Sequence, residues 1–317
     1  MLTPEILHYL AVGLAVALGS IGTGIGQGIG AYSAIDALSR QKDGNDQVFR
    51  AMIIGLAFIE SGVILALVIT LITLFGGGAT MTMPIAVAEI GIALAVGIAA
   101  TAISIASSFA LKSACQSIAR QPFFAQKILT LMMLAQSIIE APVVFAFIIA
   151  LVIRSNFSES MTIFDGLKFL SAGICMSLGC IGPCIGQGIF ASASCQAAGL
   201  NKDAYNRIFP FSIINEAVIE TPLIFCLLVS ILLIYLPISE FKPIASTINF
   251  LVAGLTIGLG SFGTAISAGF VAGKSCYQIA LEPENYSVLF RTTILSQAFI
   301  ESSAIYTLII ALSLITR

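Results

Sequence analysis

Long apolar runs alternate with short polar stretches along the whole chain. Runs without Asp, Glu, Lys or Arg cover residues 9–35, 61–88, 90–111, 169–201 and 243–273. Most of these runs exceed the ~20 apolar residues that one helix needs to cross a bilayer. The pattern therefore predicts membrane-spanning helices rather than the elements of a water-soluble domain.

Acidic residues recur inside the apolar runs at separations of 80, 80 and 81 residues: Glu60, Glu140, Glu220 and Glu301. The sequence around each acid is similar, as in AFIESGVI around the first and AFIESSAI around the last. The glycine-rich run GSIGTGIGQGIGAYSA at 19–34 returns as GCIGPCIGQGIFASAS at 179–194. Self-similarity at one fixed period predicts four copies of a module of about 80 residues.

Each module has a run of small residues, a short polar stretch and a second apolar run with the glutamate near its middle. We predict two membrane helices joined by a polar loop, and hence an all-α membrane protein of four tandem hairpins and eight spans. The expected hairpins cover residues 1–78, 79–158, 159–239 and 240–317. Glu60 follows Arg50 by ten residues, or about 15 Å of helix, which is close to the middle of a bilayer. The four acids are expected to share one plane.

The polar stretches at 38–50, 118–127, 199–207 and 281–291 carry most of the basic charge. With their flanks they contain ten of the 14 Lys and Arg residues. The positive-inside rule then predicts cytoplasmic loops and both termini outside. The N-terminal MLTPEILHYL has no Lys or Arg, so it lacks the basic region of a cleavable signal, and we expect the first span to belong to the mature protein.

Composition agrees with a membrane protein and narrows the chemistry. The chain is 58% hydrophobic and 9% charged, with a mean hydropathy of +1.04 and a net charge of −2 without any basic block, so nucleic acid is not an expected partner. The seven cysteines lack CxxC spacing and are interpreted as apolar packing residues. His8 and Glu89, at the outer ends of their spans, are expected to be interfacial. The glycine runs lack the strand and the Gly-Lys-Ser of a phosphate loop, and favour close helix packing.

A carboxylate in lipid is costly when ionised, so it prefers to hold a proton or a well-coordinated cation. A single such acid can be a structural hydrogen-bonding group. Four acids at one depth and one period instead predict ion carriage, because packing alone gives no reason for an acid at each site.

Taken together, three features resemble the c subunit of F-type ATP synthases, the hairpin that forms the rotor ring. These features are the glycine-rich first helix, the loop triplet Arg120-Gln121-Pro122 and the mid-membrane glutamate of the second helix. The likeness covers essentially the whole chain, four times over. The two-hairpin proteolipid of V-type ATPases is a relative, but one of its halves often lacks the carboxylate. Arg40-Gln41 also matches the F-type loop, whereas modules three and four depart from it with Leu200-Asn201 and Leu281-Glu282.

The resemblance implies that the four hairpins form part of a homo-oligomeric rotor ring in a bacterial inner membrane. Implied partners are a stator a subunit with its arginine, central stalk subunits and membrane lipid. Stalk contacts are implied for Arg40, Gln41, Arg120, Gln121 and Pro122. Each glutamate would take an ion from the stator, cross the lipid in neutral form and release the ion near the arginine. No cofactor is implied beyond the transported H⁺ or Na⁺, and no residue for ATP chemistry.

In sodium-binding rings of this family, a Gln and the Glu of one hairpin meet a hydroxyl and a Tyr that lie one and five positions after a neighbour's Glu. The matching positions here hold Gln27, Ser61, Ser107, Gln187, Thr221, Ser302 and Tyr306. Ser302 and Tyr306 can complete either the Gln187–Glu220 pair or the Gln27–Glu60 pair of the next chain, depending on ring direction. The site that faces Ala141 lacks the hydroxyl in both cases, which favours protons, because every site must serve the same ion.

Glu216 lies one turn before Glu220 on nearly the same helix face. It can share a proton with Glu220 or act as a polar filler. The filler role is favoured, because modules two and four place Gln136 and Gln297 at the equivalent position.

Two other functions remain open at this level. An eight-span transporter or channel can line its pathway with the acids, although such proteins usually have inverted repeats and broken helices. The repeats here are parallel and broken only by Pro142 and Pro222, just after their acids. A purely structural proteolipid should tolerate Gln in place of all four acids.

Overall fold

The computed structural model describes residues 3–40, 44–76, 81–239 and 241–316, and the regular structure in these ranges is helical throughout. The helices are α1 (Pro4–Arg40), α2 (Asn45–Phe75), α3 (Met83–Arg120), α4 (Ala125–Ile139), α5 (Ala141–Ser155), α6 (Ile163–Leu200), α7 (Tyr205–Tyr235), α8 (Pro243–Leu281) and α9 (Tyr286–Ile315). Within the described residues, eight helical segments are long and apolar enough to cross a membrane, with α4 and α5 forming one of them. The prediction of an all-α membrane protein with eight spans is confirmed.

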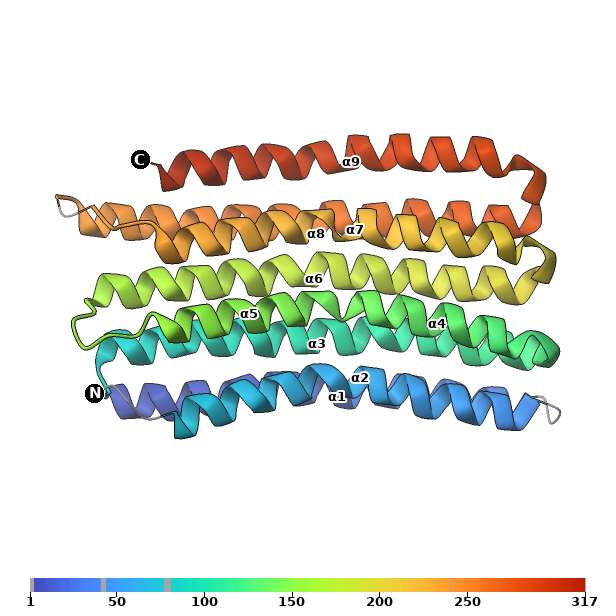
Figure 1. The fold of residues 1–317 in the computed structure, drawn as a ribbon, viewed down its shortest axis with the longest axis horizontal. Coiled ribbons are helices and arrows are strands. Elements are labelled where there is room, and N and C mark those ends of the chain that lie inside the picture. Colours follow the sequence, from blue (N-terminus) through green and yellow to red (C-terminus); the bar gives the residue numbers. More distant parts are fainter. Residues whose placement is uncertain (1–2, 41–43, 77–80, 240, 317) are drawn as a thin grey trace.

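The interruption between α4 and α5 falls at Glu140 and has a local cause. Pro142 has no N–H group and therefore cannot complete the helical ladder. The two segments nevertheless continue end to end (Figure 1). Pro222 occupies the same place in α7 without ending that helix.

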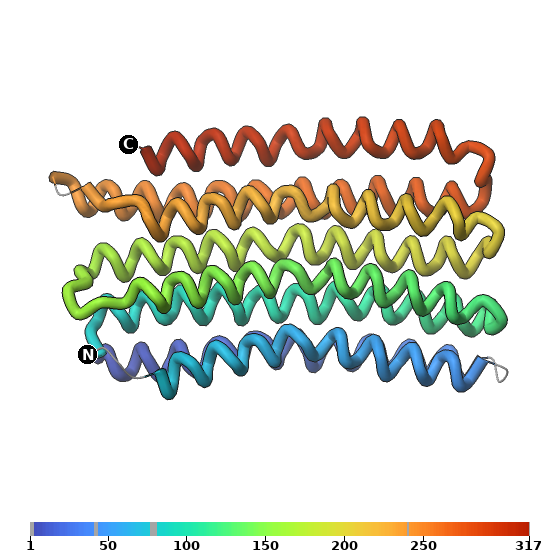
Figure 2. Tube along the Cα trace, viewed as in Figure 1, coloured from blue at the N-terminus to red at the C-terminus, as the bar shows by residue number. Residues whose placement is uncertain are grey.

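The hairpins stack side by side in chain order, with every helix along one common direction (Figure 1). The first helices α1, α3, α6 and α8 pack on one another as one layer, and the second helices pack against them as the other. Both termini lie at one end, and the loops inside the second, third and fourth hairpins lie at the opposite end (Figure 2).

Small residues make the layer of first helices possible. A Cβ added at Gly22 would overlap the backbone of Thr101, and one added at Gly186 would overlap the carbonyl of Ala265. Because only a hydrogen fits at these points, the glycine runs serve close helix packing, as in other membrane proteins.

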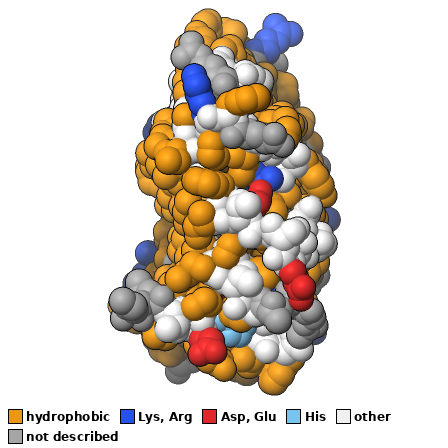
Figure 3. All heavy atoms as spheres, turned by 90° about the vertical axis from the view of Figure 1, so that its left-hand side faces the viewer, with side chains coloured by type: hydrophobic (Ala, Val, Ile, Leu, Met, Phe, Trp, Pro, Cys, Tyr) orange, Lys and Arg blue, Asp and Glu red, His pale blue; other side chains and the backbone are white. Residues whose placement is uncertain are grey.

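Apolar side chains dominate both the buried and the exposed surfaces. The seven cysteines are buried and unpaired. Exposed Ile53, Ile64, Leu228 and Phe299 lie on the second helices, where lipid would contact them. Figure 3 shows the end that carries the termini, where few charged side chains lie among apolar ones.

Candidate functional site

The four glutamates lie at equivalent places in the second layer. Glu60, Glu220 and Glu301 stand halfway along α2, α7 and α9, and Glu140 stands at the α4–α5 junction. Glu60 is exposed, whereas the other three are partly buried. This difference follows from position, because Glu60 belongs to the first hairpin and no described hairpin precedes it.

Hydroxyl groups connect the acid of one hairpin to the hairpin before it. Ser61 Oγ donates to Glu140 Oε1 at 2.9 Å, and the Thr221 side chain lies beside the Glu301 carboxyl in the corresponding place. Each hydroxyl directly follows the acid of its own hairpin and serves the acid of the next. By the same geometry Ala141 is the residue that faces the Glu220 site, and it offers no hydroxyl.

This direction corrects one of the two sodium combinations. Ser302 and Tyr306 are not brought to Glu220, because the hydroxyls reach forward along the chain and not backward. Ser302 Oγ instead donates to Phe299 O of its own helix at 2.7 Å, and Tyr306 is 65% exposed. Within one chain, both residues lie on the free edge of the last hairpin.

One turn before the acids, glutamine side chains tie the two helix layers together. Gln136 Nε2 donates to Ser107 O at 3.2 Å and Gly55 O at 3.3 Å. Gln297 Nε2 donates to Ala268 O at 3.5 Å. In the third hairpin the donor lies on the other layer, where Gln187 Nε2 reaches Glu216 O at 3.4 Å. Gln27, on α1 of the first hairpin, is partly buried.

The loop end holds the remaining predicted residues. Arg120, Gln121 and Pro122 line a groove together with residues 200–203 of the next hairpin, and Gln121 Nε2 donates to Leu200 O at 3.5 Å. Arg40 pairs with Asp36 at 3.0 Å, and Gln41 lies outside the described residues.

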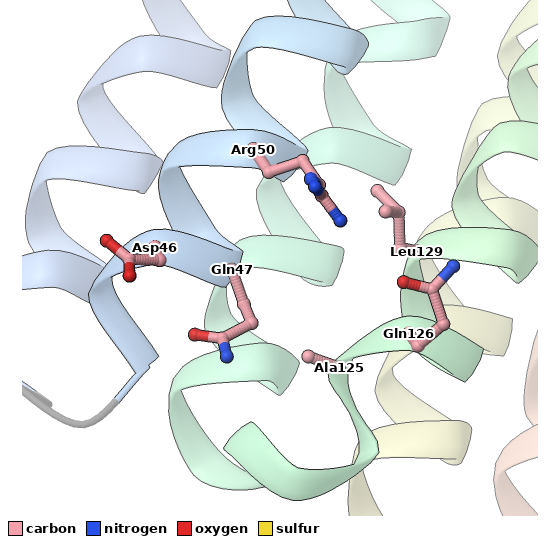
Figure 4. A pocket seen from close by; sticks show the side chains of 6 residues that line it. All are labelled: Asp46, Gln47, Arg50, Ala125, Gln126 and Leu129. Carbon is pink, nitrogen blue, oxygen red and sulfur yellow. The ribbon is translucent and has the colours of Figure 1, made fainter.

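A second pocket at this end lies between the first two hairpins. It is lined by Asp46, Gln47, Arg50, Ala125, Gln126 and Leu129. Figure 4 shows Arg50 of α2 pointing across the pocket toward Leu129 and Gln126 of α4. The loop end therefore presents polar and apolar groups from neighbouring hairpins to one surface.

The expectation that Glu89 is merely interfacial was wrong. Its side chain is buried, accepts a hydrogen bond from His8 Nδ1 at 2.6 Å and lies 3.7 Å from Arg154 Nη1. Arg154 also donates to Gly76 O. The cluster joins α1, α3 and α5 near the end that carries the termini. The sequence pattern did not predict this cluster, because His8 and Glu89 are 81 residues apart.

The fold and the acids together define a class of integral membrane protein, in which helical hairpins stand side by side and each carries one carboxyl group halfway along its second helix. The family model for the C subunit of ATP synthase matches residues 10–73, 90–153, 170–233 and 251–314. The chain belongs to this ATP synthase C-subunit family, and it contains the family's unit four times.

Curated relatives match about one hairpin at a time. The ATP synthase c subunit of Geotalea uraniireducens is 50% identical over 66 residues, which is 21% of this chain and 72% of that protein. The ATP synthase c subunit of Dehalococcoides mccartyi is 42% identical over 71 residues, 22% of this chain and 93% of that protein. A single hairpin here corresponds to most of each relative.

Proposed function

We propose that this chain is a non-catalytic, ion-carrying subunit of the rotor ring of a rotary ATP synthase or ATPase. Each hairpin uses its mid-membrane glutamate to carry one H⁺, coupled to rotation. The observation that carries the proposal is the row of four carboxyl groups, each halfway along a second helix. Glu140, Glu220 and Glu301 each follow a hairpin of the same chain that can face them.

The two free edges of the chain support assembly into a ring. A Cβ added at Gly13 or Gly28 of α1 meets nothing, whereas the equivalent Gly173 and Gly188 of α6 touch the preceding α3. At the other edge Gly263 of α8 is open. Its equivalent, Gly182, packs on the following helix at Phe262.

A second copy can therefore continue the internal packing head to tail, with its α1 against the α8 of the first. Such an interface is heterologous, and it forms a closed ring when the rotation between hairpins closes. A ring made of this chain alone contains hairpins in multiples of four. The same contact brings Ser302 and Tyr306 to the Gln27–Glu60 site of the next copy.

The geometry supports a rotary cycle with a stator a subunit. A glutamate takes its ion in the stator, becomes neutral and can then move into lipid, where an ionised carboxylate is costly. After one turn it releases the ion near the stator arginine. The loop residues Arg40, Gln41, Arg120, Gln121 and Pro122 would contact the central stalk, and the exposed apolar second helices would contact membrane lipid.

Protons fit the four sites better than sodium does. Sodium is a hard cation that needs several oxygen ligands, and the Glu220 site receives no hydroxyl from Ala141. Since every site passes one stator, the site poorest in oxygen limits the choice of ion. The sodium alternative rests on Gln27 and Glu60 with Ser302 and Tyr306 of the preceding copy. The loops would face the cytoplasm of a bacterial inner membrane, with both termini outside.

Carbodiimide labelling tests the proposal directly. Dicyclohexylcarbodiimide attacks protonated carboxyl groups that it can reach from the lipid, and mass spectrometry locates the modified residues. We expect Glu60, Glu140, Glu220 and Glu301 to be labelled, with a dependence on pH and none on Na⁺. Protection of Glu60 by Na⁺ at neutral pH would replace the proton with sodium, and a failure to label any of the four would contradict ion carriage itself.

A further inference from the structure

Glu216 is a fifth carboxyl group inside the membrane, and the ion-carrying cycle does not use it. Its side chain is 1% exposed, and both of its carboxyl oxygens are buried without a hydrogen-bond partner. Among the described residues it takes part in no salt bridge. An ionised carboxylate in such a place would be an uncompensated buried charge, which proteins avoid.

The repeat shows what the position requires. The equivalent Gln136 and Gln297 each donate an amide hydrogen to the main-chain carbonyl of an α3 or α8 residue, Ser107 or Ala268. The equivalent of those two residues in the third hairpin is Gln187. A donor is therefore the group that fits at position 216, opposite the α6 backbone. A carboxylate only accepts hydrogen bonds, whereas a protonated carboxyl also donates one.

The neighbours of Glu216 contribute no positive charge. On its own helix Glu220 follows one turn later, and the thiols of Cys195 on α6 and Cys276 on α8 lie near it. The amide oxygen of Gln187, also buried, has no donor. A single hydrogen on Glu216 would supply a donor to a cluster that is otherwise rich in acceptor oxygen atoms.

We infer that Glu216 is a resident proton site: it keeps one proton that is not transported, and that proton serves as the hydrogen-bond donor between α7 and α6. Residence follows from burial, because Glu216 is enclosed between helices whereas Glu220 is partly exposed on the second layer. The third hairpin thus holds two protons when Glu220 is loaded and one when it is discharged. The inference does not depend on the rotor function, since it concerns the protonation of the isolated protein.

Infrared spectroscopy of the purified full-length protein in lipid bilayers tests this inference, because protonated and ionised carboxyl groups absorb in separate regions. We expect Glu216→Gln to remove one protonated-carboxyl band. That band should persist after carbodiimide treatment of the wild-type protein and through the pH range in which the labelling of the other acids is lost. Glu220→Gln is the matched control, and it should remove a band that carbodiimide also removes.

Two results would overturn the inference. One is the loss of an ionised-carboxylate band in Glu216→Gln, which would show that Glu216 is charged and holds a cation. The other is the loss of a protonated band that carbodiimide or alkaline pH also removes, which would show that the proton exchanges. If Glu216→Gln does not accumulate, Gln136→Glu provides the same test at the equivalent position of the second hairpin. An added protonated-carboxyl band would support a resident proton at this position, and an added carboxylate band would contradict it.

Discussion

At the scale of single residues, the surroundings of the four glutamates, the proposed ion sites, differ mainly in the side chain that the preceding hairpin places beside the acid. Ser61 donates a hydrogen bond to Glu140, and Thr221 lies beside Glu301. Ala141, at the equivalent position before Glu220, has no hydroxyl group. Removing one hydroxyl should therefore change the site of the following hairpin and leave its own hairpin's site unaffected.

We predict that Ser61→Ala speeds the carbodiimide labelling of Glu140, because the hydroxyl no longer occupies Glu140 Oε1. A typical hydrogen bond contributes about 0.5–1.5 kcal/mol, which corresponds to roughly a 2- to 10-fold change in rate. Labelling rates at each acid, measured by mass spectrometry, check this, with Glu301 in the same chain as the control. A change at Glu60 with none at Glu140 would show that the hydroxyls reach the opposite way.

The four acids could be predicted from the sequence, because a carboxyl in an apolar run at a fixed period is rare. The sequence did not predict the direction of the hydroxyl contacts, because that direction depends on the handedness with which the hairpins pack. A repeat period gives no information on that handedness. Glu89 was misjudged for a related reason. Its distance from the helix start predicted an interfacial place, but its partners His8 and Arg154 come from other helices.

At the scale of helices, the glycine runs decide how closely the first layer packs. The sequence predicted their role, but it did not show which glycines touch a neighbour. Gly186 lies against the main-chain carbonyl of Ala265, which cannot move aside, whereas a Cβ added at Gly263 would meet no neighbouring atom. The two glycines should therefore respond differently to the same small change.

We predict that Gly186→Ala destabilises the α6–α8 contact, since overpacking a tight interface costs about 1–3 kcal/mol. Thermal unfolding of the purified protein in detergent measures the loss. Gly263→Ala is the matched control and should leave the unfolding temperature of the single chain nearly unchanged. Equal losses in both variants would contradict the proposed cause, because helix propensity favours Ala over Gly at both positions and only Gly186 touches a neighbouring backbone.

At the scale of the whole molecule, the chain is an open array whose two edges match each other. Gly13 and Gly28 of α1 are equivalent to glycines of α6 that pack against the preceding hairpin. Gly263 of α8 is equivalent to a glycine of α6 that packs against the following hairpin. Covalent fusion fixes the order of four unlike hairpins, so that Ala141 always precedes the Glu220 site. The sequence alone predicted a ring from resemblance, whereas the edges give a physical reason for one.

Gly263→Leu should test this directly, because a leucine side chain there would fill the space that the next copy's α1 needs while leaving the chain's own packing intact. We expect wild-type protein in mild detergent to form a closed oligomer by native mass spectrometry, and the variant to remain as single chains. Gly13→Leu, on the opposite edge, should have the same effect, because one interface uses both surfaces. Rings that form normally from both variants would show that the edges do not meet head to tail, and a wild-type protein that stays monomeric would favour the eight-span transporter over the rotor.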